Sequence, residues 1–173
     1  MPIIKLKKSI IPSCDVDSLE KLDKLVKATC NVRGVGAYKI GFELVIPFGM
    51  EKVVKAIRKH TKLPIIYDHQ KAGTDIPDMG MKFMSACKGA DAVILFPQAG
   101  PETEAAWIKA AQQAKMNVII GGEMTHKGYL KNENDPKDER KKEESKVDDI
   151  NPFKALFQLF GFFNGGSKKD KGK

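Results

Sequence analysis

The chain has 173 residues, a length that suggests one domain with enough residues to bury a core. Its longest apolar stretches are only as long as a strand, and its basic start lacks the apolar run of a signal peptide, so we expect a cytoplasmic protein with no membrane association. Three cysteines without Cys-x-x-Cys spacing argue against a disulfide framework and a zinc site. Of the net charge of +8, residues 1–130 carry +6 without a Lys/Arg cluster interleaved with aromatic residues, as a base-stacking surface would require, and a mildly basic surface also suits an anionic, phosphorylated small substrate.

Short apolar runs alternate with segments of helical length over residues 1–125. The runs cover residues 10–11, 35–40, 63–67, 92–96 and 118–120, and the helical segments cover residues 18–29, 49–60, 76–88 and 101–114. Strands separated by helices of this length indicate βαβ units and a parallel sheet. The repeat has no obvious reversal point, which favours a barrel over an open sheet. We therefore predict an α/β fold, a partial (β/α)8 TIM barrel with about five parallel strands and outer helices.

Two of the predicted helices begin with recognisable start signals. Asp17 or Ser18 can cap the first helix. Pro101 stands where a first-turn proline belongs, and Glu102 and Glu104 follow it near the positive end of the helix dipole.

The composition changes at Lys131. Fourteen of the 19 residues 131–149 are charged, and residues 150–163 hold five of the nine phenylalanines before a basic end. We predict an incomplete barrel at residues 1–130 and a charged linker with an irregular, Phe-rich and basic-ended tail at residues 131–173. The tail's apolar part fits a membrane-surface helix or a cover for an open sheet edge, and its basic end leaves nucleic-acid binding as a remote alternative.

Ionisable side chains follow four of the five predicted strands. A single Asp after a strand is more often a helix cap, but here two lysines and three aspartates follow three successive strands. At the carboxyl ends of a parallel sheet they would form a network of alternating charges, in which pKa values shift and proton transfer becomes feasible. These residues are Asp15, Lys39, Asp68, Lys71 and Asp75.

These segments resemble the motifs of the orotidine 5′-monophosphate decarboxylase family. Asp68-His-Gln-Lys71-Ala-Gly-Thr-Asp75-Ile76-Pro77 is similar to the family's third-strand signature, an Asp, a Lys and a second Asp before Ile-Pro or Ile-Gly. Four further segments are similar to the motifs of the first, second, fourth and fifth strands: Ile11-Pro-Ser-Cys-Asp15-Val16, Tyr38-Lys39-Ile40-Gly41, Gly89-Ala-Asp-Ala-Val-Ile94 and Glu123-Met124-Thr125-His126-Lys127-Gly128. The five motifs occur in order over about 120 residues.

The resemblance implies decarboxylation of orotidine 5′-monophosphate to UMP, a step of pyrimidine biosynthesis, with no cofactor and no metal. It implies that Lys71 stabilises the negative charge that develops at C6 and then protonates C6, while Asp68 lies near the departing carboxylate. Lys39 and Asp15 would bond the ribose hydroxyls. Asp75, with Ile76 beside it, would reach the neighbouring site of a homodimer. Thr125 would bond the pyrimidine, whereas Glu123 and His126 are more consistent with structural roles.

The sequence departs from the family pattern in two ways. The spacing is Asp-x-Lys-x-x-Asp in the family, whereas here one extra residue stands on each side of Lys71, which a bulge and a longer turn at Gly73 would absorb. The extra residue could also give His69 part of the role of Asp68. In addition, three strand–helix units and the family's phosphate-binding Arg are not recognisable after residue 130.

Without that phosphate grip, the 173-residue chain would be a weak or inactive enzyme alone. One alternative is a non-catalytic truncated barrel that serves in binding or assembly. The other is a related phosphate-sugar decarboxylase or aldolase, since such enzymes share the Asp–Lys–Asp strand.

Overall fold

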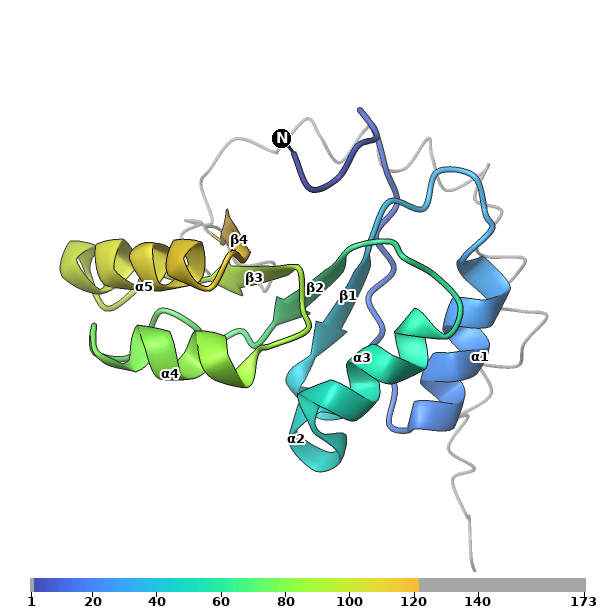
Figure 1. Cartoon of the computed structure of the whole chain (residues 1–173), viewed down its shortest axis with the longest axis horizontal. Helices are drawn as coiled ribbons and strands as arrows, with labels where there is room; N and C mark the ends of the chain where they lie inside the picture. The colour runs from blue at the N-terminus through green and yellow to red at the C-terminus, as the bar shows by residue number, and fades with distance from the viewer. Residues whose placement is uncertain (1, 122–173) are drawn as a thin grey trace, which may run out of the picture. The chain divides into compact units, whose positions relative to one another are not determined.

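The computed structural model describes residues 2–121 of the protein (Figure 1). The chain divides into two units, residues 1–125 and 126–173, and the second unit lies outside the described residues. The predicted boundary near residue 130 and the predicted tail therefore stay predictions. No helix in the described part is long and apolar enough to cross a membrane.

The described residues form a parallel sheet with strands in the order β1-β2-β3-β4. Neighbours in sequence are neighbours in the sheet and pair in parallel, so the helices lie on the outside of the curved sheet (Figure 1). This is the arrangement of an incomplete (β/α) barrel. The elements are α1 (Leu19–Thr29), β1 (Tyr38–Gly41), α2 (Phe42–Phe48), α3 (Met50–Arg58), β2 (Ile65–Asp68), α4 (Met79–Ala86), β3 (Ala92–Leu95), α5 (Pro101–Gln113) and β4 (Asn117–Ile120).

The first of the five expected strands is reduced to two isolated parallel bridges, Ile10 with Val35 and Ser13 with Lys39. Between the two bridges lie two residues on one side and three on the other, so the two segments lose register there. Pro12 also has no N–H to donate, although its carbonyl still accepts a bond from the Lys39 N–H at 3.0 Å. The segment therefore runs beside β1 without forming a continuous strand, and four strands are present where about five were predicted.

The helix start signals act as the sequence predicts. Ser18, rather than Asp17, caps α1, and its hydroxyl accepts a hydrogen bond from the Lys21 N–H at 3.3 Å. Pro101 lies in the first turn of α5. The short helix α2 was not expected, because it contains Pro47 and follows β1 without a linker.

The two faces of the sheet bury different side chains, because successive residues of a strand point to opposite faces. Toward the helices the strands bury large side chains: Tyr38, Ile40, Ile65, Tyr67, Val93 and Leu95. On the inner face Ala37, Ile66 and Ala92 form a smaller apolar cluster with Ile3, Ile4, Ile11, Ile94 and Ile119. The N-terminal segment thus contributes to the inner face of the incomplete barrel.

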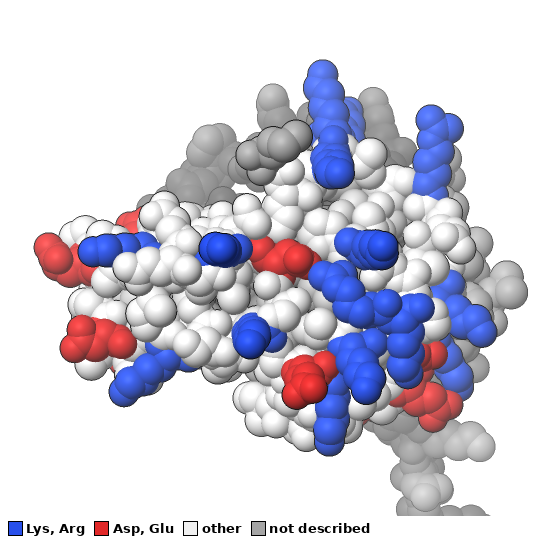
Figure 2. All heavy atoms as spheres, viewed as in Figure 1, with Lys and Arg blue, Asp and Glu red and all other residues white. Residues whose placement is uncertain are grey.

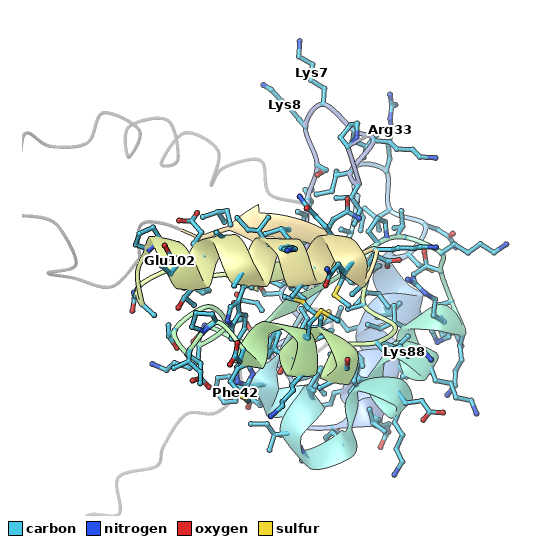
Figure 3. The ribbon with its side chains drawn as sticks, turned by 60° about the vertical axis from the view of Figure 1, so that its left-hand side comes forward. Lys7, Lys8, Arg33, Phe42, Lys88 and Glu102 are labelled. Atoms are coloured by element: carbon cyan, nitrogen blue, oxygen red, sulfur yellow. The ribbon has the colours of Figure 1, made fainter. Side chains whose placement is uncertain are left out.

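Charge is distributed unevenly over this framework. Lys and Arg side chains gather over α1 and α3, with a few acidic side chains among them, and further acidic side chains lie at the outer end of α5 and in the centre of the view (Figure 2). Figure 3 shows Lys7, Lys8 and Arg33 together at the top of the view, Lys88 at the right and Glu102 at the left. Part of this polarity follows from the helix dipoles, because Lys27, Lys55 and Arg58 lie in last turns and Glu102 and Glu104 in a first turn.

Candidate functional site

The residue pair Lys39 and Asp68 lies on the inner face near the carboxyl ends of β1 and β2. Lys39 is paired in register with Ile66, and Gly41 with Asp68, so both charged side chains point to the same face. Lys39 Nζ lies 3.0 Å from Asp68 Oδ2. Their side chains are 29% and 10% exposed, so this ion pair is largely shielded from water.

The second oxygen of the Asp68 carboxylate is left without a partner. Asp68 Oδ1 is the only buried side-chain N or O atom of the described residues that has no hydrogen bond. An unpartnered buried polar atom costs about 1–3 kcal/mol, so native structures rarely keep one without a use for it. Asp68 therefore holds a free acceptor at the carboxyl end of β2.

Asp15 lies beside this pair. The Cys14 N–H donates to the Lys39 carbonyl at 2.8 Å, which fixes the chain next to β1. Asp15 Oδ1 lies 3.4 Å from the position that a Cβ on Gly41 would occupy, so the missing side chain of Gly41 leaves room for this carboxylate. Burial raises the pKa of the Cys14 thiol to about 12, so that it stays protonated and is no nucleophile.

Lys71 lies in the loop that follows β2 and is exposed. The extra residue before Lys71 is absorbed in this loop rather than by a bulge in the strand, because β2 ends at Asp68 and Gln70 takes a positive φ of 63°. A turn follows, in which Thr74 N–H donates to the Lys71 carbonyl at 3.2 Å and Gly73 has a φ of 86°. The expected longer turn at Gly73 is thus present. In the described residues Lys71 makes no ion pair, so the structure does not join it to Asp68.

Asp75 and Ile76 are both exposed further along this loop. The Asp75 carboxylate accepts a bond from the Ile76 N–H at 2.7 Å, and Ile76 is 60% exposed. Among the described residues, no hydrogen bond or ion pair joins either of them to the Lys39–Asp68 pair. Their predicted roles stay predictions, as do those of Lys39, Asp15, Asp68 and Lys71.

The structure places His69 away from the role considered for it. The His69 ring lies 2.6 Å through Nδ1 from the Tyr67 hydroxyl and contacts the rings of Tyr67 and Phe83. It belongs to an aromatic cluster on the helix side of the sheet, whereas Asp68 faces Lys39. This cluster was not predicted from the sequence. The alternation of β2 was one signal for it, because it places Tyr67 on the face opposite to Asp68.

Three residues considered in the sequence, Glu123, Thr125 and His126, lie outside the described residues. Over residues 2–121, no group of three or more His, Cys, Asp or Glu side chains is arranged to hold a metal ion. The charged groups that the described site brings together are the Lys39 ammonium and the carboxylates of Asp68 and Asp15.

Two solved structures resemble the chain at 29% sequence identity. Both are of orotidine 5′-monophosphate decarboxylase from Methanocaldococcus jannaschii. The first has a TM-score of 0.62 and the second, a complex with the inhibitor BMP, has 0.63. Each match covers 70% of this chain, and 57% and 55% respectively of the solved chain. This chain thus matches little more than half the length of those proteins.

A third structure, orotidine 5′-phosphate decarboxylase from Pyrococcus horikoshii OT3, is 24% identical with a TM-score of 0.58, over 70% of this chain and 55% of that one, and supports the fold alone. The model of the orotidine 5′-phosphate decarboxylase / HUMPS family matches residues 8–172, a range that runs on into the segment predicted as a tail. The order of the strands, the site at their carboxyl ends and the extent of this match agree: the chain belongs to the orotidine 5′-phosphate decarboxylase / HUMPS family.

Proposed function

We propose that the protein decarboxylates orotidine 5′-monophosphate to UMP without a cofactor. The observation that carries this proposal is the shielded Lys39–Asp68 pair, whose second carboxylate oxygen has no partner, at the strand ends of a chain of this family. The two structures at 29% identity, both of orotidine 5′-monophosphate decarboxylases, support this branch of the family over its sugar-phosphate branch.

Lys39 and Asp15 are proposed to bind the ribose hydroxyls. The Lys39 ammonium donates to Asp68 and keeps further N–H groups free, while Asp15 presents a carboxylate that accepts hydrogen bonds. Both side chains come from neighbouring segments that are hydrogen-bonded to each other, so their separation is set by the backbone. Such a rigid pair can orient a sugar before the reaction begins.

Asp68 and Lys71 are proposed to act on the pyrimidine. Loss of carbon dioxide leaves an electron pair at C6, and the Lys71 ammonium would stabilise this charge and then donate a proton to C6. The free oxygen Asp68 Oδ1 would accept a hydrogen bond from the Lys71 ammonium once the exposed Lys71 side chain turns toward the bound substrate. The negative charge of the Asp68 carboxylate would also repel the carboxylate of the substrate, and this repulsion would favour the loss of carbon dioxide.

The substrate phosphate is expected to limit turnover by this chain. Binding energy from a remote group such as a phosphate lowers the barrier at the reacting carbon. In the described residues no Arg stands at the carboxyl end of the sheet, because Arg33 and Arg58 precede strands or end a helix. We therefore propose slow turnover by the 173-residue chain alone, and faster turnover when three further strand–helix units with a phosphate-binding Arg are appended to it.

A UMP-formation assay with orotidine 5′-monophosphate tests the proposal. We expect UMP above the uncatalysed rate, abolished by Lys71→Ala and kept by Lys82→Ala, which removes an exposed lysine of α4 instead. Binding of the inhibitor BMP to the wild type is the accompanying measurement. If UMP does not form and BMP does not bind, the proposal is wrong, and aldol cleavage of a hexulose phosphate would instead assign the sugar-phosphate branch.

We further propose that the protein acts as a cytoplasmic homodimer in pyrimidine biosynthesis. Asp75 and Ile76 are exposed on the loop after β2, and this supports a role for Asp75 in the site of a second copy. Analytical sedimentation at micromolar concentration measures the oligomeric state directly. A monomer would leave Asp75 without its proposed function.

A further inference from the structure

Four aromatic side chains form one continuous cluster between β2, α4 and α5. The rings of Tyr67 and Phe83 are stacked, with centroids 6.0 Å apart and an interplanar angle of 12°. Phe83 also contacts Trp107 at 5.2 Å and His69 at 5.8 Å. Tyr67 and Trp107 are 4% and 3% exposed, so the cluster is part of the core rather than of the surface.

This cluster holds both ends of the loop that carries Lys71 and Asp75. At the start of the loop, His69 Nδ1 lies 2.6 Å from the Tyr67 hydroxyl. At its end, the Trp107 indole N–H donates to the Ile76 carbonyl at 3.1 Å. Burial raises the pKa of Tyr67 to about 12, so the hydroxyl keeps its proton at neutral pH.

A third tether holds the middle of the loop. The Phe96 N–H, at the end of β3, donates to the Ala72 carbonyl at 2.7 Å. A Cβ on Gly73 would lie 3.2 Å from the Phe96 carbonyl oxygen, so the loop backbone packs directly on the end of β3. Between these tethers the side chains of Lys71 and Asp75 remain exposed.

We infer that the aromatic cluster is a clamp that positions Lys71, with Tyr67 and Trp107 as positioning residues for the proposed decarboxylation. The backbone on either side of Lys71 is fixed from the helix side of the sheet, while its side chain stays free to meet the substrate. The inference rests on the proposed function for its catalytic consequence, but the tethering of the loop is a property of the protein itself. Because the clamp touches neither Lys39 nor Asp15, its loss would lower kcat and leave KM nearly unchanged.

The test compares Tyr67→Phe with Tyr38→Phe. Both variants remove a buried tyrosine hydroxyl and keep the ring, but the Tyr38 hydroxyl bonds to Thr29 Oγ1 at 2.8 Å, far from the loop. Hydrogen exchange of peptides that cover residues 69–78 is measured together with kcat and KM. Trp107→Phe, which removes the N–H at the other end of the loop, is the second variant.

We expect Tyr67→Phe and Trp107→Phe each to speed loop exchange about fivefold, since each removes one tether. Both should lower kcat by a similar factor at unchanged KM, while Tyr38→Phe leaves loop exchange and kcat as in the wild type. Unchanged loop exchange in both loop variants would overturn the clamp. If the wild type shows no decarboxylase activity, the proposed function is wrong. Faster loop exchange in Tyr67→Phe and Trp107→Phe would still support the tethering of the loop.

Discussion

The two ends of the sheet differ in how far their polar side chains are hydrogen-bonded. At the amino end, the Arg58 guanidinium donates to the Leu63 carbonyl at 2.6 Å and to Asp91 Oδ2 at 2.5 Å, and Asp91 Oδ2 also accepts from the Ile65 N–H at 2.8 Å. The Asp91 carbonyl in turn accepts from both the backbone and the side chain of Asn117. These hydrogen bonds join α3, β2, β3 and β4 at this end of the sheet.

At the carboxyl end, by contrast, Asp68 Oδ1 has no partner and Lys71 makes no ion pair within the described residues. An amino acid sequence selected for stability alone would pair or replace a buried carboxylate oxygen of this kind. The polar groups at the amino end thus stabilise the fold, whereas the carboxyl end keeps an unused hydrogen-bond acceptor, as the proposed function requires.

The largest expected effect is that of Lys71→Ala on catalysis. Removing the proposed proton donor should lower kcat by roughly a thousandfold, the scale of general acid catalysis with charge stabilisation. The side chain is exposed, so the free energy of unfolding should change by less than about 0.5 kcal/mol. Steady-state kinetics and urea denaturation measure the two quantities, and a large loss of stability would give Lys71 a structural role.

The corresponding variant at the amino end of the sheet is Arg58→Ala, which should change stability rather than catalysis. It removes two hydrogen bonds of a partly exposed network, so the free energy of unfolding should fall by about 1–2 kcal/mol after allowance for solvent screening. The rate of decarboxylation should not change. Lys55→Ala on the same helix is the control, since Lys55 is exposed and makes no ion pair among the described residues. A loss of rate without a loss of stability would erase the contrast between the two ends.

A smaller effect is expected from Gly73→Ala. The left-handed φ of 86° should cost about 1 kcal/mol with any Cβ, and contact with the Phe96 backbone should add to this. Gly34→Ala is the matched control, because Gly34 has a φ of 101° and open space around it. We expect Gly73→Ala to be the less stable variant in thermal unfolding and also to lower kcat. Equal loss in both variants would show that the loop is not packed on β3.

The smallest effect concerns Asp23, which joins α1 to the end of α3. The hydrogen bond with His60, at 3.0 Å, holds the pKa of the Asp23 carboxyl below its usual value of 3.8. A carboxyl with a lowered pKa adds stability above its unfolded pKa and loses it as the pH falls through the folded pKa. The wild type should therefore exceed Asp23→Asn slightly in stability at pH 5, and this difference should vanish in urea titrations between pH 4 and pH 2. A difference that grows as the pH falls contradicts the assignment.

Much of the fold was predictable because the sequence alternates between strand-length and helix-length segments. The four strands begin or end within a few residues of the predicted runs, and Ser18 and Pro101 mark helix starts as expected. The helix α2 was missed because Pro47 and a short length hide its period. The first strand was overestimated because its lost register with β1 depends on the partner, which a local pattern does not contain.

The site was predictable only as far as side chains follow the alternation of a strand. Lys39 and Asp68 lie within strands, so their common face could be derived and the structure shows them in contact. His69 follows β2 directly, and continued alternation puts it on the face of Tyr67, where its ring lies, rather than with Asp68. The tether from Trp107 to Ile76 joins residues 31 apart in sequence, which no local pattern reveals.

The most direct test of the contrast between the two ends is Asp68→Asn, with Asp91→Asn as its counterpart. For Asp68→Asn we predict a smaller loss in the free energy of unfolding than for Asp91→Asn, because the partly exposed Lys39 ammonium can regain water and an amide oxygen can still accept its hydrogen bond. The affinity for the inhibitor BMP should fall at least tenfold. Asp91→Asn should lose stability and keep this affinity. A marked loss of stability in Asp68→Asn, with BMP binding unchanged, would contradict the claim that the carboxyl end is kept for a ligand.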